Sequence, residues 1–276
     1  MEHEFKVDSP IVIDRILSRN LGKWSKDLRN EIILDTTPVP FFGDFENATI
    51  ISIGINPSSE EFPSLINKRR LCHLSDLKQP IDYYKEGLTA MTSEEAMRIS
   101  KSLLNYFEIN PYKDWFDLAE TAINGAGATF YKNKEKSSNF KIACHVDLFP
   151  WATKAYSRLD SSVQKELKLE NSEFMMHFIE SERVEKVIFF GNDSKNGCKD
   201  AAEYLGIELG IKKIKSIKGR FGVTFEVGDF EVAGNSKQYF LTTSGPSART
   251  KGDKFTELNK NEVHISFAKF IQEWSY

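Results

Sequence analysis

The chain has 276 residues, of which 40% are hydrophobic and 21 are Phe, so it is long enough to bury one large core. Its formal net charge of −3 does not indicate nucleic-acid binding, although a total says little about any one face. Three widely spaced cysteines exclude a disulfide framework and a four-thiolate metal cluster. We expect a cytoplasmic protein without membrane segments, because no signal-peptide core and no apolar run of about 18 residues is present.

The first half of the chain predicts helices on either side of one buried strand. Apolar residues at helical spacing from Pro10 to Arg29 predict a helical extension over about residues 1–38. The β-branched run 49–53 is typical of a buried parallel strand. Residues 93–107 have the spacing of an amphipathic helix with Ser93 as its N-cap, and a second helix is expected around Trp115.

The second half continues the alternation. Strands are expected at 142–149, 187–191 and 238–242, and a helix is expected from Asp193 or Ser194 to Leu205. Residues 223–227 and 230–233, joined by Gly228-Asp229, are typical of a hairpin, and a last helix covers about 259–275. Strands alternating with helices predict an α/β fold: one domain over 1–276, built as a three-layer αβα sandwich.

Polar residues follow three of these strands and are the candidates for chemistry. Asn56 comes directly after the first strand, Asp147 ends the second, and the Ser244–Arg249 turn follows the last. Carboxyl ends of parallel strands share one edge, where ligands bind in open α/β sheets. Gly54 allows a close approach to the strand end, and Pro57 fixes the turn. The alternative for Asn56 is a loop residue that hydrogen-bonds its own turn.

Other chemistries find little support in the sequence. Five scattered His show no metal-ligand spacing, so no metal site is expected. Cys144 and His145 are neighbours on a strand and point to opposite faces, which excludes a nucleophile–base pair. The sequence contains neither a P-loop nor a Gly-x-Ser-x-Gly elbow, and no cofactor is expected.

Two of the strand-end motifs resemble those of a known family. Gly54-Ile55-Asn56-Pro57 resembles the first active-site motif of the uracil-DNA glycosylase superfamily. Ser244-Gly245-Pro246-Ser247-Ala248-Arg249 resembles the second motif of its mismatch-specific uracil and thymine glycosylase branch, and Asp147 falls where the family has its base-reading residue. The resemblance covers about residues 39–249. It implies a four-stranded parallel sheet between helices and metal-free, cofactor-free hydrolysis of the base–sugar bond.

The resemblance also implies a role for each matching residue. Asn56 would orient the water that attacks C1′ of a flipped-out nucleotide. Phe62, or one of Phe41 and Phe42, would stack on the base, whereas the alternative for the Phe pair is core packing. Arg249 would fill the gap left in the duplex, unless it is a solvated surface cation. The expected DNA-binding residues are Ser244, Ser247, Arg249 and Lys251.

Two departures from the family pattern bear on the substrate. Ser58 stands where strict uracil enzymes have a bulky Tyr, which leaves room for a substituent at C5 of the base. Asp147 replaces the usual Asn, and an ionised carboxylate suits the N4 amino group of a cytosine. Two alternatives stay open for Asp147: a protonated acid that reads the base as a donor, or a turn or helix cap before Pro150.

We therefore expect a monomeric, monofunctional DNA glycosylase that acts on duplex DNA carrying a flipped base. A 5-substituted cytosine of the kind found in some phage genomes is the favoured base, in antiphage defence. The alternatives are base-excision repair of uracil or mismatched thymine, a non-catalytic DNA-binding protein, and an enzyme of free nucleosides or nucleotides. The basic run Lys212–Arg220 would contact DNA or form a solvated connector.

Overall fold

One seven-stranded sheet organises the computed structural model, in the order β2-β3-β1-β4-β7-β6-β5. The structure describes residues 6–17, 25–33, 38–58, 61, 92–132, 139–153, 159–191, 207–217, 223–243, 246 and 257–275. The strands are β1 (Ala48–Gly54), β2 (Ala128–Thr129), β3 (Lys141–Asp147), β4 (Lys186–Phe190), β5 (Gly210–Ile217), β6 (Val223–Val232) and β7 (Asn235–Thr242).

The sheet is parallel over most of its width. β2, β3, β1, β4 and β7 pair in parallel, whereas β7–β6 and β6–β5 pair antiparallel. The predicted α/β class with a mainly parallel sheet is confirmed. The predicted number of four strands is wrong, because the short β2 extends one edge and an antiparallel pair extends the other. β3, β1, β4 and β7 form the parallel centre that the apolar runs predicted.

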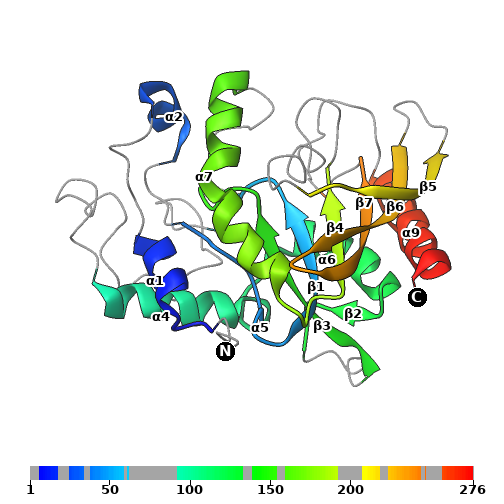
Figure 1. Ribbon diagram of the computed structural model, residues 1–276, viewed down its shortest axis with the longest axis horizontal. Coiled ribbons are helices and arrows are strands. Elements are labelled where there is room, and N and C mark those ends of the chain that lie inside the picture. The colour runs from blue at the N-terminus through cyan, green and yellow to red at the C-terminus, as the bar shows by residue number, and fades with distance from the viewer. Residues whose placement is uncertain are drawn as a thin grey trace.

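Helices cover both faces of this sheet. The described helices are α1 (Pro10–Leu17), α2 (Lys26–Glu31), α4 (Ser93–Leu104), α5 (Tyr106–Ile109), α6 (Lys113–Gly125), α7 (Ser161–Glu180) and α9 (Glu257–Trp274). Trp115 of α6 and Phe267 of α9 both pack on the Phe190 ring of β4, so these two helices share one face. Figure 1 shows α7 crossing the sheet on the opposite, near side. Among the described residues, no helix is both long and apolar enough to cross a bilayer.

The N-cap of the amphipathic helix α4 lies one residue earlier than predicted. Thr92, not Ser93, is the N-cap: its hydroxyl accepts from the backbone N–H of Glu95 at 3.2 Å, and the Glu95 carboxylate accepts from the Thr92 N–H at 2.8 Å. This reciprocal capping box satisfies two donors that the first turn of a helix leaves unpaired. The predicted buried stripe of α4 is confirmed at Ala96 and Leu103.

The predicted hairpin has its turn in the wrong place. β6 runs without interruption through the Gly228-Asp229 pair, and the chain reverses at Ala233-Gly234, where both residues have positive φ angles of 49° and 79°. A Cβ atom on Gly228 would lie only 2.0 Å from the carbonyl oxygen of Gly210. Gly228 therefore allows two strands to approach closely, which is the second common use of a strand glycine.

The basic run lies partly in the edge strand β5. Lys212, Lys213 and Lys215 are exposed there, and Lys212 forms an ion pair with Asp229 of the neighbouring strand. This part of the run is therefore a strand and not a connector. Exposed lysines on an edge strand discourage pairing with other chains. Lys218, Arg220 and the predicted helix from Asp193 to Leu205 lie outside the described residues.

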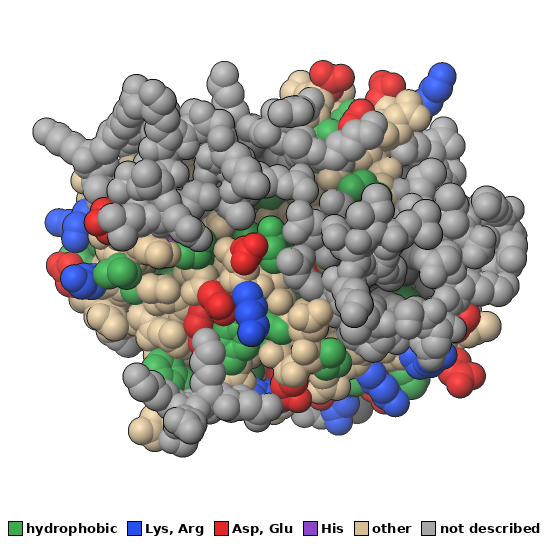
Figure 2. Space-filling model, turned by 180° about the vertical axis from the view of Figure 1, so that it is seen from behind, with side chains coloured by type: hydrophobic (Ala, Val, Ile, Leu, Met, Phe, Trp, Pro, Cys, Tyr) green, Lys and Arg blue, Asp and Glu red, His purple; other side chains and the backbone are tan. Residues whose placement is uncertain are grey.

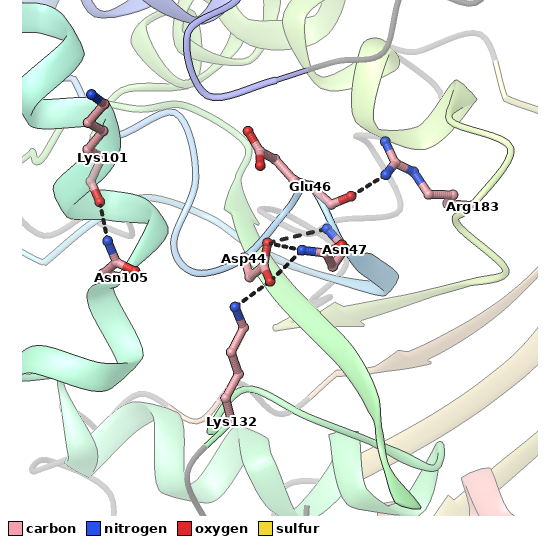
Figure 3. Close-up of polar contacts among 7 residues, drawn as sticks. All are labelled: Asp44, Glu46, Asn47, Lys101, Asn105, Lys132 and Arg183. Carbon is pink, nitrogen blue, oxygen red and sulfur yellow. Dashed lines mark hydrogen bonds and ion pairs between the residues drawn. The ribbon is translucent and has the colours of Figure 1, made fainter. Parts of the chain in front are cut away.

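The amino end of β1 is fixed by a polar cluster shown in Figure 3. The buried Asp44 carboxylate accepts from the side-chain amide of Asn47 at 2.9 Å and pairs with Lys132 Nζ at 2.5 Å. Arg183, in the turn before β4, donates to the backbone carbonyl of Glu46. These contacts tie the entry of β1 to segments that flank β2 and β4.

Candidate functional site

The polar residues that follow β1 and β3 lie together at the carboxyl edge of the sheet. Gly54 and Asp147 are partners in the parallel register of these strands. The pairing continues past both strands, since the N–H of Leu148 donates to the Gly54 carbonyl and the N–H of Phe149 donates to the Ile55 carbonyl, each at 3.2 Å. The segment that carries Asn56 therefore runs beside the segment that follows Asp147.

The Asn56 side chain is half-buried and anchored on both segments. Its amide nitrogen donates to the carbonyl of Pro57 and to the hydroxyl of Thr153, each at 3.2 Å. The first bond is the turn contact that the alternative interpretation of Asn56 predicted, and the second crosses to the chain after β3. Within the described part of the protein, the amide oxygen of Asn56 accepts no hydrogen bond, so it can accept one from a water molecule.

Asp147 and Gly54 fit each other closely. Asp147 is 4% exposed, and a Cβ atom on Gly54 would lie 2.5 Å from its Oδ1 atom and 2.9 Å from the His145 ring. Any side chain at position 54 would therefore displace one of these two groups. The sequence predicted a close approach at Gly54, either of other backbone or of a ligand. In the structure the side chains of Asp147 and His145 make this close approach.

Behind Asp147 lies a chain of buried polar groups that sequence reasoning missed. The Asp147 carboxylate is 3.2 Å from Nε2 of His145, and Nδ1 of His145 is 2.7 Å from the Ser52 hydroxyl. Ser52 pairs with His145 in the β1–β3 register, just as Gly54 pairs with Asp147. Alternation along two paired strands was the available signal, because it places the residues two positions before Gly54 and Asp147 on the same face.

Aromatic rings surround the imidazole of His145. Trp115 and Phe116 of α6 lie 4.6 Å and 5.3 Å from it between ring centroids, and Phe42 lies 5.9 Å away. Phe42 also exchanges backbone hydrogen bonds with His145 at 2.8 Å and 3.0 Å. The Phe42 ring is 2% exposed, so it packs in the core behind the site and presents no open face to a base. The prediction that Phe42 stacks on a base has no support in this position.

A second buried carboxylate follows the first motif. Glu61 is buried, its N–H donates to the Ser58 carbonyl at 3.0 Å, and its carboxylate accepts from the Tyr106 hydroxyl at 2.7 Å. That hydroxyl in turn accepts from the N–H of Tyr112 at 2.8 Å. No role was predicted for Glu61 from the sequence. Ser58, the residue expected to leave room at C5, is half-buried.

The third strand-end motif begins at the same edge. β7 is the second neighbour of β1 across β4, so its end at Thr242 lies about 10 Å from the end of β1 across the sheet. The residues predicted to act there lie outside the described part of the chain, as does the expected stacking residue Phe62: they are Ser244, Ser247, Arg249 and Lys251.

The surroundings of Cys144 do not favour thiol chemistry. Burial, with a smaller contribution from Asp44, raises the pKa of the Cys144 thiol far above its usual range, so the thiol stays protonated. No group of three metal-ligating side chains occurs in the ranges that the structure describes.

Figure 2 shows Lys and Arg interspersed with Asp and Glu on the described part of the rear face, which therefore carries mixed charge.

Comparison with known proteins adds nothing to this picture: no protein-family model, curated protein or solved structure matches the chain. The fold and site define an α/β protein with a polar cluster at the carboxyl edge of a mainly parallel sheet.

Proposed function

We propose that this protein is a monofunctional DNA glycosylase that removes a flipped-out pyrimidine, with a 5-substituted cytosine as the preferred base. The observation that carries the proposal is the common position of Asn56 and Asp147, which follow neighbouring parallel strands at one edge of the sheet. A reaction at C1′ needs a water on one side of the sugar and a group that recognises the base on the other.

In this proposal Asn56 orients the attacking water. Its amide nitrogen is held by Pro57 and Thr153, which fixes the plane of the side chain and directs the amide oxygen to a water O–H. A neutral amide is a poor base, so the rate depends on departure of the base from an oxocarbenium-like sugar. Positioning of the water by a fixed side chain then lowers the entropic part of the barrier.

Asp147 is the proposed base-reading residue. An ionised carboxylate is an acceptor only, and it matches the N4 amino group of cytosine, whereas uracil and thymine present a carbonyl oxygen at that position. Ser58 is the small residue that accommodates a group at C5. The roles of Phe62, Ser244, Ser247, Arg249 and Lys251 rest on the family resemblance. An enzyme with this preference would act on phage DNA that carries modified cytosine.

The test is base release from duplexes that each carry one candidate base. Oligonucleotides with cytosine, 5-hydroxymethylcytosine, its glucosylated form, uracil or a G·T mismatch are incubated with the protein and then treated with alkali, which cleaves abasic sites. We expect cleavage with the 5-substituted cytosines. Cleavage with uracil or G·T alone would identify a repair enzyme instead, and no cleavage with any duplex would contradict the proposal.

Asn56→Ala separates a glycosylase from a DNA-binding protein. We expect base release to fall about 100-fold or more, because water is no longer held in line, while salt-dependent DNA binding is kept. Asn105→Ala is the matched control, since Asn105 is an exposed residue whose amide donates to the Lys101 carbonyl at 3.0 Å (Figure 3). Equal release by the two variants would remove Asn56 from the mechanism.

A further inference from the structure

Three buried polar side chains form a continuous path from the core to the candidate site. Ser52, His145 and Asp147 are 0%, 2% and 4% exposed, and all three project from the sheet face that α6 covers. These three residues are almost wholly shielded from water, and the last of them is the proposed base-reading residue. The role proposed for Asn56 does not involve them. Their contact with the site is the one between the His145 ring and the Asp147 carboxylate.

The distances assign the hydrogens in this chain. The Ser52 hydroxyl has two possible acceptors: Nδ1 of His145 at 2.7 Å, and the carbonyl oxygen of Cys144 at 3.4 Å. The shorter contact is a full hydrogen bond and the longer one is marginal. Ser52 therefore donates to Nδ1, which leaves the ring proton on Nε2, facing Oδ1 of Asp147 at 3.2 Å. The opposite direction would make a protonated Asp147 the donor and leave the Ser52 proton on the marginal contact.

We propose that His145, oriented by Ser52, is a positioning residue that holds Asp147 as a hydrogen-bond acceptor and so makes the site specific for pyrimidines with an exocyclic amino group. This inference rests on the proposed glycosylase function and names its substrate class. A donor directed at a carboxylate stabilises its ionised form. Of the two protonation states that the sequence left open for Asp147, this arrangement selects the ionised one.

The surroundings keep the imidazole in this orientation. The Trp115, Phe116 and Phe42 rings pack around it, and the backbone ladder between Phe42 and His145 fixes the position of the main chain. The absence of a side chain at Gly54 provides the space in which His145 and Asp147 meet.

The same chain predicts how the specificity can be reversed. In Asp147→Asn, the amide oxygen would accept from His145 Nε2–H, and the amide NH₂ would then point toward the base as a donor. A donor at this position matches the O4 carbonyl of uracil and opposes the amino group of cytosine. His145 therefore orients either residue, and the chemistry of position 147 decides which base is accepted.

The test compares release of 5-hydroxymethylcytosine with release of uracil, as a ratio of kcat/KM values for each variant. We expect Asp147→Asn to move this ratio toward uracil by about 100-fold or more, from the loss of one favourable contact and the gain of an opposing one. We expect His145→Leu to lower the ratio by about tenfold, and His145→Gln, whose amide can still donate to Asp147, to restore most of it.

A ratio is insensitive to the fraction of each variant that is folded, and thermal unfolding of each variant records that fraction separately. An unchanged ratio in His145→Leu, with cytosine-type release intact in the wild-type protein, would overturn the role of His145 while leaving the glycosylase proposal standing. No release by the wild-type protein would overturn both.

A second measurement needs no activity. The NMR shifts of the imidazole nitrogens in the wild-type protein report which nitrogen carries the proton. We expect a proton on Nε2. A proton on Nδ1 alone would overturn the proposed direction of the hydrogen bonds from Ser52 through His145 to Asp147, even if every variant failed to fold.

Discussion

Two buried carboxylates in this protein have different surroundings. Glu120 of α6 accepts from the Thr129 hydroxyl at 2.6 Å and from the N–H of Phe130 at 2.9 Å, so both of its oxygens connect α6 to the β2 segment. Asp147 ends a central strand, and one of its partners is the ring of His145, at 3.2 Å. Glu120 is hydrogen-bonded by the segments that it connects. Asp147 contacts the buried His145, which in turn contacts the buried Ser52, at the edge where parallel sheets bind ligands.

Burial alone does not identify a functional site in this protein. Both residues are less than 5% exposed, and both are hydrogen-bonded as buried charges must be. Their positions in the fold and the nature of their partners separate them. We therefore expect changes next to Asp147 to alter base release, and changes next to Glu120 to alter stability.

The largest effect is expected for Gly54→Ala. The new Cβ atom would lie 2.5 Å from Asp147 Oδ1 and 2.9 Å from the His145 ring, so the contact between these two groups cannot stay as it is. We expect base release to fall about 100-fold, because a displacement of about 1 Å at a site can cost that much. Single-turnover release from the 5-hydroxymethylcytosine duplex checks it. Unchanged release would show that the Asp147 position in this structure is not the one that matters.

Glu120→Gln sharpens the comparison from the other side. The amide oxygen can still accept from the Phe130 N–H, but the NH₂ group then faces the Thr129 hydroxyl, which loses its carboxylate acceptor. Hydrogen bonds to a charged group are stronger than those to an amide, so we expect a loss of about 1–3 kcal/mol of unfolding free energy. Urea unfolding measures this loss. The ratio of cytosine to uracil release should stay at the wild-type value, and a shifted ratio would mean that Glu120 also communicates with the site.

A buried tyrosine predicts loss of stability at high pH. Burial, followed by the hydrogen bond to Glu226 at 2.7 Å, raises the pKa of Tyr239 well above 10.0. The folded protein keeps this proton when the unfolded chain loses it, so the contribution is present below about pH 10 and is lost as the pH rises further. Tyr239→Phe should make the unfolding free energy less steep above about pH 10. An identical slope in both proteins would contradict this assignment.

The smallest effect is expected on the edge strand. Lys215 is exposed on β5, and Lys215→Ala should change the unfolding free energy by less than about 0.5 kcal/mol. The same variant decides whether the basic run contacts DNA. A salt dependence of DNA binding equal to that of the wild-type protein would identify a solvated edge, and a weaker dependence would identify a phosphate contact.

The sequence predicted the parallel centre of the fold because its strands are apolar runs bounded by Gly and Pro, and these patterns are local. It failed at Gly228, where the reason for a glycine is a strand that lies far away in sequence, at Gly210. The N-cap of α4 was displaced by one residue because Ser93 and Thr92 are both good caps, and the box with Glu95 selects Thr92.

The candidate site was predictable in part for the same reason. Asn56 and Asp147 end strands, and parallel neighbours bring their ends together, so their common edge followed from topology. The chain from Ser52 through His145 did not, because it depends on the register between β1 and β3 and on which face α6 covers. Glu61 was missed because its partner Tyr106 lies on α5, in another part of the sequence.

The most direct measurement is base release from the duplex panel by the wild-type protein and by Asp147→Asn, run side by side. The account predicts that the wild-type protein releases 5-substituted cytosine and that the variant turns toward uracil. Release of the same base in the same proportion by both proteins, or release of none by either, would contradict the claim that Asp147 reads a flipped pyrimidine at this edge of the sheet.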